Sequence, residues 1–231
     1  MIRGMRISEI YASKQGEGRL TGQPSVFVRT SGCNLRCDFC DTPFTSWEPE
    51  GSQMDVEEIV RDVSGYSERH VVITGGEPML AKGVVQLTEQ LRRADFHITI
   101  ETAGTLFEDV KCDLMSVSPK LSNSTPSIER AGEWSRRHES RRIQLDVLEA
   151  LIGQYDYQLK FVVCVQKDVE EILELCEKVN PQPKKVLLMP EGTDQVTLES
   201  REQWVKDLCH HYDFSYCPRM HIKWYGNKRG T

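Results

Sequence analysis

Residues 31–42 read Ser31-Gly32-Cys33-Asn34-Leu35-Arg36-Cys37-Asp38-Phe39-Cys40-Asp41-Thr42. The three cysteines follow C-x-x-x-C-x-x-C spacing, which lets three thiolates wrap one iron–sulfur cube and bind one iron each. Cube-shaped clusters used for electron transfer normally have four cysteine ligands. A set that stops at three leaves one iron open to a substrate or cofactor. The stretch therefore predicts a reactive cluster in an enzyme active site.

The alternative for these cysteines is a structural zinc site or reduced thiols of the core. Zinc usually takes four ligands, and pairs of C-x-x-C separated by a longer loop are its commoner pattern. Five further cysteines form no other close cluster, so we expect ordinary buried or surface thiols and no second iron–sulfur site. These five are Cys112, Cys164, Cys176, Cys209 and Cys217.

Length and composition are those of a globular protein. The chain has 231 residues, of which 39% are hydrophobic and 28% charged, and this predicts a single domain over residues 1–231. A net charge of −6 argues against nucleic acid as a partner, since nucleic-acid binding needs a basic surface. No apolar run reaches the length of a membrane span. Eight cysteines without an export signal favour reduced thiols, and hence a cytoplasmic protein.

Segments rich in β-branched residues alternate with amphipathic segments along the chain. The predicted strands are Met5–Ala12, Ser25–Thr30, His70–Thr74, Phe96–Ile100, Leu114–Ser118, Tyr157–Val165, Lys185–Leu188 and His221–Trp224. The predicted helices are Val56–Val63, Gly83–Arg93, Arg142–Ile152, Val169–Val179 and Leu198–His210. Two pairs, Asp55 with Glu58 and Asp168 with Glu171, have the form of a capping box at a helix start.

This alternation predicts an α/β fold in which helical crossovers connect about six parallel strands. A closed eightfold barrel takes about 250 residues, so we expect an open, partial β/α barrel with its helices outside. The unusual motifs directly follow predicted strands. They are Cys33 after Thr30, Gly75-Gly76-Glu77-Pro78 after Thr74, Glu101-Thr102-Ala103-Gly104 after Ile100, and Ser118-Pro119-Lys120. Loops at the carboxyl ends of parallel strands form the active site in such folds, so the motifs should meet at one mouth.

The segment Gly75-Gly76-Glu77-Pro78 is the most specific of these loops. Two glycines allow close backbone approach, and Glu77 is expected to project an acceptor into the mouth. A simple turn is the alternative reading, as it is for the Ser118-Pro119-Lys120 segment.

Polar residues also follow the first two strands. Gln15-Gly16-Glu17-Gly18 offers donors and acceptors suited to the amide and amino edge of a pterin, and Arg29 suits a carboxylate. Thr42 provides a hydroxyl oxygen directly after the cluster cysteines, and such a hard ligand suits Mg²⁺. A glycine-rich surface turn and a salt-bridged arginine remain the alternatives.

The cysteine spacing followed by Gly-Gly-Glu-Pro resembles the radical S-adenosylmethionine (SAM) superfamily. With Gln15–Gly18 and Thr42, the chain resembles the 7-carboxy-7-deazaguanine synthase family of queuosine and 7-deazapurine biosynthesis, from about Glu9 to Tyr225. The resemblance implies a carbon–nitrogen lyase that converts 6-carboxy-5,6,7,8-tetrahydropterin to 7-carboxy-7-deazaguanine with loss of ammonia. It also implies one [4Fe–4S] cluster per chain, SAM cleaved to a 5′-deoxyadenosyl radical and then reused, and Mg²⁺.

The same resemblance implies a set of site residues. The cluster ligands would be Cys33, Cys37 and Cys40, and the Mg²⁺ ligand Thr42. The SAM-binding residues would be Phe39, Cys40, Asp41, Glu77, Gly104, Ser118, Pro119 and Lys120, with Met189, Pro190, Glu191 and Gly192 as a further wall. The pterin-binding residues would be Lys14, Gln15, Gly16, Glu17, Arg29, Thr102 and His221. No role follows for the tail, Gly226–Thr231.

The resemblance further implies a homodimer and a reducing partner such as flavodoxin or ferredoxin. Two other functions stay open. A glycyl-radical-enzyme activase would have the same cysteine spacing but would not need Gln15–Gly18 or Thr42, and it would require a protein partner. A non-catalytic metal-binding protein would hold zinc or a cluster without cleaving SAM.

Overall fold

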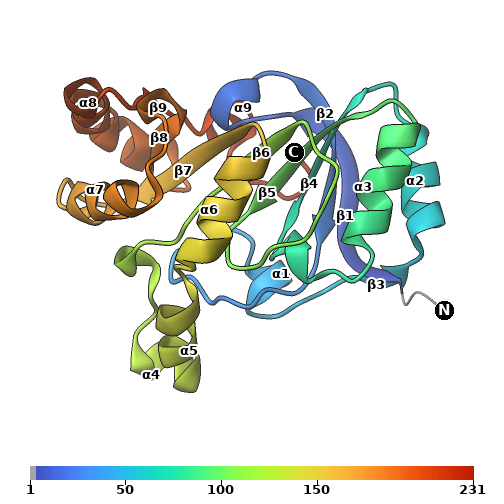
Figure 1. Cartoon of the computed structure of the whole chain (residues 1–231), viewed down its shortest axis with the longest axis horizontal. Helices are drawn as coiled ribbons and strands as arrows, with labels where there is room; N and C mark the ends of the chain where they lie inside the picture. Colours follow the sequence, from blue (N-terminus) through green and yellow to red (C-terminus); the bar gives the residue numbers. More distant parts are fainter. Residues whose placement is uncertain (1–3) are drawn as a thin grey trace.

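The computed structural model describes residues 4–231 as helices outside one open sheet (Figure 1). The strands are β1 (Met5–Lys14), β2 (Pro24–Thr30), β3 (Ser52–Met54), β4 (His70–Gly75), β5 (His97–Thr102), β6 (Leu114–Val117), β7 (Tyr157–Val163), β8 (Val186–Pro190) and β9 (Ser215–Tyr216). The helices are α1 (Pro43–Ser46), α2 (Val56–Ser64), α3 (Val84–Arg93), α4 (Ile128–Ala131), α5 (Glu133–Arg141), α6 (Leu145–Gln154), α7 (Asp168–Val179), α8 (Gln195–Tyr212) and α9 (Met220–Tyr225). No helix between residues 4 and 231 combines the length and apolar composition that a membrane span requires.

The sheet has the strand order β3-β1-β2-β4-β5-β6-β7-β8-β9. β1 pairs antiparallel with both β2 and β3, whereas every pair from β2 to β9 is parallel. Within the described residues the two outer strands, β3 and β9, do not pair with each other, so the barrel stays open. This confirms the predicted α/β class and open barrel.

Parallel strands need both faces covered, and the hydrophobic core lies where the helices meet the sheet. Strand residues such as Val28, Ile73, Ile100 and Phe161 are fully buried. α2 begins at the predicted box, where Glu58 Oε2 accepts from the Asp55 N–H at 2.9 Å. The strands and helices expected up to residue 210 are present, with ends that shift by a few residues.

One predicted strand is wrong. His221–Trp224 lies in the helix α9, which ends at Gly226 with a φ of +72°. A segment of four residues does not reveal its period, and the glycine that ends the helix was the better signal.

The second predicted capping box is also wrong. α7 begins at Asp168, whose Oδ2 accepts from the Cys164 and Val165 N–H groups and so ties down the preceding loop. Glu171 instead accepts from the backbone N–H of Ser122, at 2.9 Å. The two carboxylates therefore connect loops rather than cap their own helix.

Two short helices, α4 and α5, were not expected from the sequence. They project from the body of the molecule at the bottom of Figure 1. They contact the cysteine loop, since Arg130 of α4 pairs with Asp38, and Arg36 N–H donates to Nδ1 of His138 in α5 at 3.1 Å. The segment between β6 and α6 thus supports the loop from its outer side.

Candidate functional site

A cavity of about 750 Å³ lies at the carboxyl ends of the parallel strands. The loops after β2, β4, β5, β6 and β8 reach it, as predicted for a barrel mouth, and the loop after β1 and helix α9 complete the wall. The predicted site residues that line it are Lys14, Gln15, Gly16, Glu17, Arg29, Cys33, Cys37, Phe39, Cys40, Asp41, Thr42, Thr102, Ser118, Lys120, Met189, Glu191 and His221. Five predicted residues do not line it: Glu77, Gly104, Pro119, Pro190 and Gly192.

The three thiols of the loop are partly buried on one side of this cavity. The loop is held from behind, because Trp47 Nε1 donates to Cys37 O at 3.0 Å. Arg130 also contacts Asp38 and lies over the ring of Trp47, 4.7 Å from its centroid. Burial raises the pKa of Cys33 and of Cys37 to about 12, so both are neutral thiols in the metal-free chain.

The three thiols come from one loop and line one cavity, as the ligands of a cluster would. A zinc site needs its ligands about 2.3 Å from one point, whereas a cube takes each thiolate at a different iron. Three separate thiols facing one cavity therefore suit a cube with an open iron.

Backbone packing at Gly75 and Gly76 brings two loops together beside the cysteines. Gly75 has a φ of +129°, and a Cβ at Gly76 would lie 2.2 Å from the carbonyl oxygen of Gly32. The N–H of Glu77 donates to this oxygen at 2.9 Å. Glycine is required at both positions, and the exposed backbone forms part of the cavity wall.

Contrary to the expectation from the sequence, the side chain of Glu77 does not project into the mouth. Its side chain is buried behind the wall, where Oε1 accepts from Thr102 Oγ1 at 2.8 Å and Oε2 from the Ala103 N–H at 2.8 Å. The N–H of Met79 also donates to it, at 3.1 Å. Burial raises the pKa of Glu77, while these hydrogen bonds oppose the shift. The residue braces the loops after β4 and β5 against each other.

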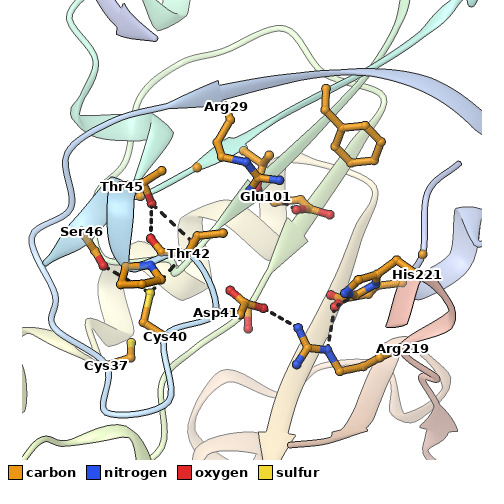
Figure 2. Close-up of a pocket in the computed structure, with 18 of the residues that line it drawn as sticks. Arg29, Cys37, Cys40, Asp41, Thr42, Thr45, Ser46, Glu101, Arg219 and His221 are labelled. Atoms are coloured by element: carbon orange, nitrogen blue, oxygen red, sulfur yellow. Dashed lines mark hydrogen bonds and ion pairs between the residues drawn. The ribbon is translucent and has the colours of Figure 1, made fainter. Parts of the chain in front are cut away.

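Across the cavity from Cys37 and Cys40, Glu17, Lys160 and Arg219 form a buried network of charged side chains that reaches the more exposed Asp41. Glu17 contacts Lys160 through Oε2 and accepts from Arg219 Nε through Oε1 at 3.1 Å. Arg219 continues to Asp41, which faces it in Figure 2. Burial alone would raise the pKa of Glu17, but Lys160 and Arg219 outweigh it and hold this pKa well below its usual range. Glu17 is therefore a fixed carboxylate.

Gln15 is buried beside this network, and part of its amide is used within the protein. Nε2 donates to Glu101 Oε1 at 3.0 Å, and Oε1 accepts from the Glu17 N–H at 3.1 Å. The other oxygen of Glu101 accepts from Thr74 Oγ1 at 2.8 Å. An amide has two donors and two acceptor lone pairs, so one of each remains for a ligand.

Part of the Arg29 guanidinium is likewise hydrogen-bonded within the protein. Nε donates to Glu9 Oε1 and one Nη to the Tyr11 hydroxyl, both at 2.7 Å. A guanidinium has five N–H donors, so the part that faces the cavity keeps donors for an anion. His221 joins this wall from α9, and burial lowers its pKa.

The remaining predicted residues close the sides of the mouth. Lys120 Nζ donates to Ser118 Oγ at 2.8 Å, so the two side chains act as one unit. Glu191 is paired with Arg201 at 2.5 Å. Lys14 lies over the Trp224 ring, 5.9 Å from its centroid.

Several lining residues were given no role from the sequence. They are Lys160, Arg219, Glu101, Tyr11 and the tail residues Asn227–Thr231. A signal existed for Lys160 and Glu101, because each is a charged residue within a predicted or bordering strand of the parallel sheet, and such residues are rarely buried without a partner. No comparable signal marks the tail, which is held by Arg229 through Glu9 at 3.0 Å and Glu50 at 2.8 Å.

His138 supports the cysteine loop and should make stability depend on pH. Its Nδ1 accepts from Arg36 N–H at 3.1 Å, and Nε2 lies 3.0 Å from Ser124 Oγ, so the fold requires the neutral ring. Burial lowers its pKa to about 4. Below the unfolded pKa of about 6.5 the unfolded chain binds a proton that the folded chain excludes. Stability is therefore full above pH 6.5 and is lost as the pH falls toward 4.

We expect His138 to lower the free energy of unfolding by roughly 2 kcal/mol between pH 7 and pH 5. Urea unfolding of the metal-free protein at both pH values measures this loss. It should shrink in His138→Gln and persist in the control His211→Gln, because His211 is exposed on α8. An identical loss in His138→Gln would rule out this role.

Residues 27–152 match the Radical SAM superfamily. This match includes the cysteine loop, Gly75–Gly76 and Glu101–Gly104, so it covers the half of the cavity that carries the thiols.

Curated relatives match over nearly the whole chain. A 7-carboxy-7-deazaguanine synthase of Rhodopirellula baltica is 45% identical over 97% of this chain and 88% of its own length. One of Halobacterium salinarum is 46% identical over 94% of this chain and 88% of its own length. Among solved structures, QueE from Escherichia coli superposes with a TM-score of 0.69 and 26% identity, covering 93% of both chains.

Proposed function

Because the chain belongs to the radical SAM superfamily and, within it, to the 7-carboxy-7-deazaguanine synthase family, we propose that its cavity holds cluster, SAM and pterin side by side. The chain is a lyase of queuosine biosynthesis that converts 6-carboxy-5,6,7,8-tetrahydropterin to 7-carboxy-7-deazaguanine with loss of ammonia. The relatives support neither the activase nor the non-catalytic alternative.

One observation carries the assignment of sites: a single cavity has three thiols on one side and a fixed carboxylate with a partly free guanidinium on the other. Cys33, Cys37 and Cys40 would hold the [4Fe–4S] cluster. Bound together, the cluster and SAM supply one-electron radical initiation. Phe39, Asp41, Ser118 and Lys120 border the space next to the thiols, where SAM would bind.

Gly75 and Gly76 expose backbone to this SAM space, and Glu77 supports it from behind. We propose this supporting role for Glu77, and its direct contact with SAM stays a prediction from the family. Met189 and Glu191 would form the far wall, while Gly104, Pro119, Pro190 and Gly192 shape the loops without facing the cavity.

Glu17 and Gln15 would form hydrogen bonds with the amide and amino edge of the pterin. The ionised Glu17 accepts from N–H groups of the pterin, and Lys160 with Arg219 keeps it charged and oriented. Arg29 would bind the substrate carboxylate through its cavity-facing donors, with Lys14, Thr102 and His221 around the ring. Gly16 leaves room for His221, since a Cβ there would lie 2.5 Å from Nδ1.

The test of the activity is direct. Reduced, cluster-loaded protein is incubated with SAM, Mg²⁺ and 6-carboxy-5,6,7,8-tetrahydropterin, and mass spectrometry should detect 7-carboxy-7-deazaguanine. SAM cleavage without this product, under conditions that support a relative, would contradict the assigned substrate.

We propose Thr42 as the Mg²⁺ ligand of the chain. Its side chain lines the cavity, its hydroxyl does not cap α1, and the contacts of this hydroxyl with Thr45 Oγ1 at 3.4 Å and Cys40 Sγ at 3.9 Å are long. The hydroxyl is therefore available as a hard oxygen ligand, with substrate oxygens and water completing the shell.

Thr42→Ala should leave cluster absorbance and SAM binding intact while pterin turnover falls and its Mg²⁺ dependence weakens or moves to higher concentration. A Mg²⁺ titration at matched cluster content measures this, with Thr42→Ser as the control that keeps the oxygen. Superimposable titration curves for wild type and Thr42→Ala would count against the metal role.

The remaining predictions concern the setting of the enzyme. All eight cysteines are free, which suits a reducing compartment such as the cytoplasm. All nine described strands join one sheet, which supports a single domain, although residues 1–3 lie outside the described part. The flavodoxin- or ferredoxin-like reductant and the homodimer stay predictions from the family.

A further inference from the structure

The hydroxyl of Ser46 lies against the sulfur of one proposed cluster ligand. Ser46 Oγ is 3.2 Å from Cys40 Sγ (Figure 2), and Ser46 is only 3% exposed. Within residues 4–231 this hydroxyl makes no other hydrogen bond. A buried hydroxyl normally has a partner, so the sulfur is the group that satisfies it.

The direction of this hydrogen bond follows from the state of the sulfur. In the metal-free chain either group could donate. A thiolate bound to iron has no proton and can only accept, so Ser46 must then be the donor. We infer that Ser46 donates a hydrogen bond to the cluster-bound Cys40 sulfur and thereby raises the reduction potential of the cluster. The inference rests on the proposed cluster assignment.

Helix α1 fixes the hydroxyl in this position. The N–H of Gly32 donates to Thr45 O at 2.8 Å, and Thr45 Oγ1 donates to Thr42 O at 2.9 Å. The two loops on either side of the cysteines are thus tied to the helix that carries Ser46. Because Thr45 is fully buried, this end of the helix has little freedom to turn Ser46 away.

The Ser46–Cys40 contact can be compared with the other hydrogen-bond contacts of the proposed cluster ligands. Among the described residues, the other groups recorded near the cluster sulfurs are the Leu35 N–H, 3.4 Å from Cys33 Sγ, and Thr42 Oγ1, 3.9 Å from Cys40 Sγ. The three sulfurs are therefore unequal, and the contact of Ser46 with the Cys40 sulfur is shorter than these two.

The redox consequence is electrostatic. Reduction moves one electron from the donor protein to the oxidised cluster; the donor loses one electron, and no bond or proton changes hands. The added negative charge is shared by the thiolate sulfurs, so a hydrogen bond to sulfur stabilises the reduced form more than the oxidised one. Hydrogen bonds to the sulfurs are among the factors that set such potentials.

The experiment compares variants by redox titration, followed by electron paramagnetic resonance, of cluster-loaded protein without SAM or pterin. Ser46→Ala should disfavour reduction about tenfold at a fixed donor potential, which is about 59 mV for a one-electron couple. Ser46→Thr keeps the hydroxyl and should restore most of the wild-type potential. Thr45→Val is the matched control, because it removes a buried hydroxyl one residue away that does not contact sulfur.

An unchanged potential in Ser46→Ala would overturn the inference, as would an equal fall in Thr45→Val. If Ser46→Ala does not load the cluster, Ser46→Cys replaces it, since a thiol of similar size is a weaker donor and should give an intermediate fall. An unchanged potential in Ser46→Cys would then overturn the inference. Failure of the proposed function would give a different result from failure of this inference. In that case the wild-type protein itself would hold no cluster or would form no 7-carboxy-7-deazaguanine.

Discussion

Cys37→Ala is expected to lose essentially all cluster iron and all SAM cleavage. Cys37 is one of three thiols among the described residues that line the cavity, and a cube held by two thiolates is labile. Iron and sulfide analysis of anaerobically prepared protein measures the loss. Cys33→Ala and Cys40→Ala should behave in the same way.

Cys176→Ala is the matched control for this loss. Cys176 is a partly buried thiol on α7 that does not line the cavity, so its removal should leave iron content near the wild-type value. If the Cys176 variant lost iron as completely as the Cys37 variant, the assignment of ligands would be wrong.

Glu17→Leu is expected to cost roughly 3–5 kcal/mol of unfolding free energy, because it leaves the Lys160 ammonium buried without its ion-pair partner. The side chain of Lys160 is 6% exposed, so water cannot replace the lost carboxylate. Pterin turnover should fall roughly tenfold or more, since a charge-assisted hydrogen bond contributes about 1.5–3 kcal/mol. Urea unfolding and product formation at matched cluster content measure the two effects.

The double variant Glu17→Leu/Lys160→Met separates stability from recognition. Removing both charges should restore part of the unfolding free energy, whereas pterin turnover should stay low because the acceptor is still missing. Cluster iron content should remain near wild type in both variants, since Glu17 lies across the cavity from Cys37 and Cys40. Recovery of turnover in the double variant would assign Glu17 a purely structural role.

The strands and long helices could be predicted because each extends over enough residues to show its period. His221–Trp224 is too short for that, and besides Gly226 at its end, the helix is fixed by its contact with the loop after β1, where Met220 N–H donates to Gly16 O at 2.9 Å. The α4–α5 segment is polar and charged around its surface, so its packing against the cysteine loop depends on contacts that no local pattern encodes.

The role of a site residue could be predicted where its type and spacing together indicate a specific chemistry. Three cysteines at cluster spacing are such a case, and they line the cavity as expected. Carboxylates are less specific: Glu77 and Glu17 both follow glycine, yet one is a buried brace and the other lies in the cavity wall. Lys160 and Arg219 decide the difference, and only the fold brings them to Glu17 from positions far along the chain.

The high pKa values of the Cys33 and Cys37 thiols affect how easily these residues are oxidised before the cluster is inserted. The thiolate is the species that oxidants and alkylating agents attack, and with a pKa of about 12 Cys33 and Cys37 are almost entirely protonated at neutral pH. The empty protein should therefore resist accidental disulfide formation at the site. The same protonation opposes loading, because every thiol must release its proton to bind iron. Maturation should accordingly proceed faster in mildly alkaline buffer, with protons released as iron is taken up.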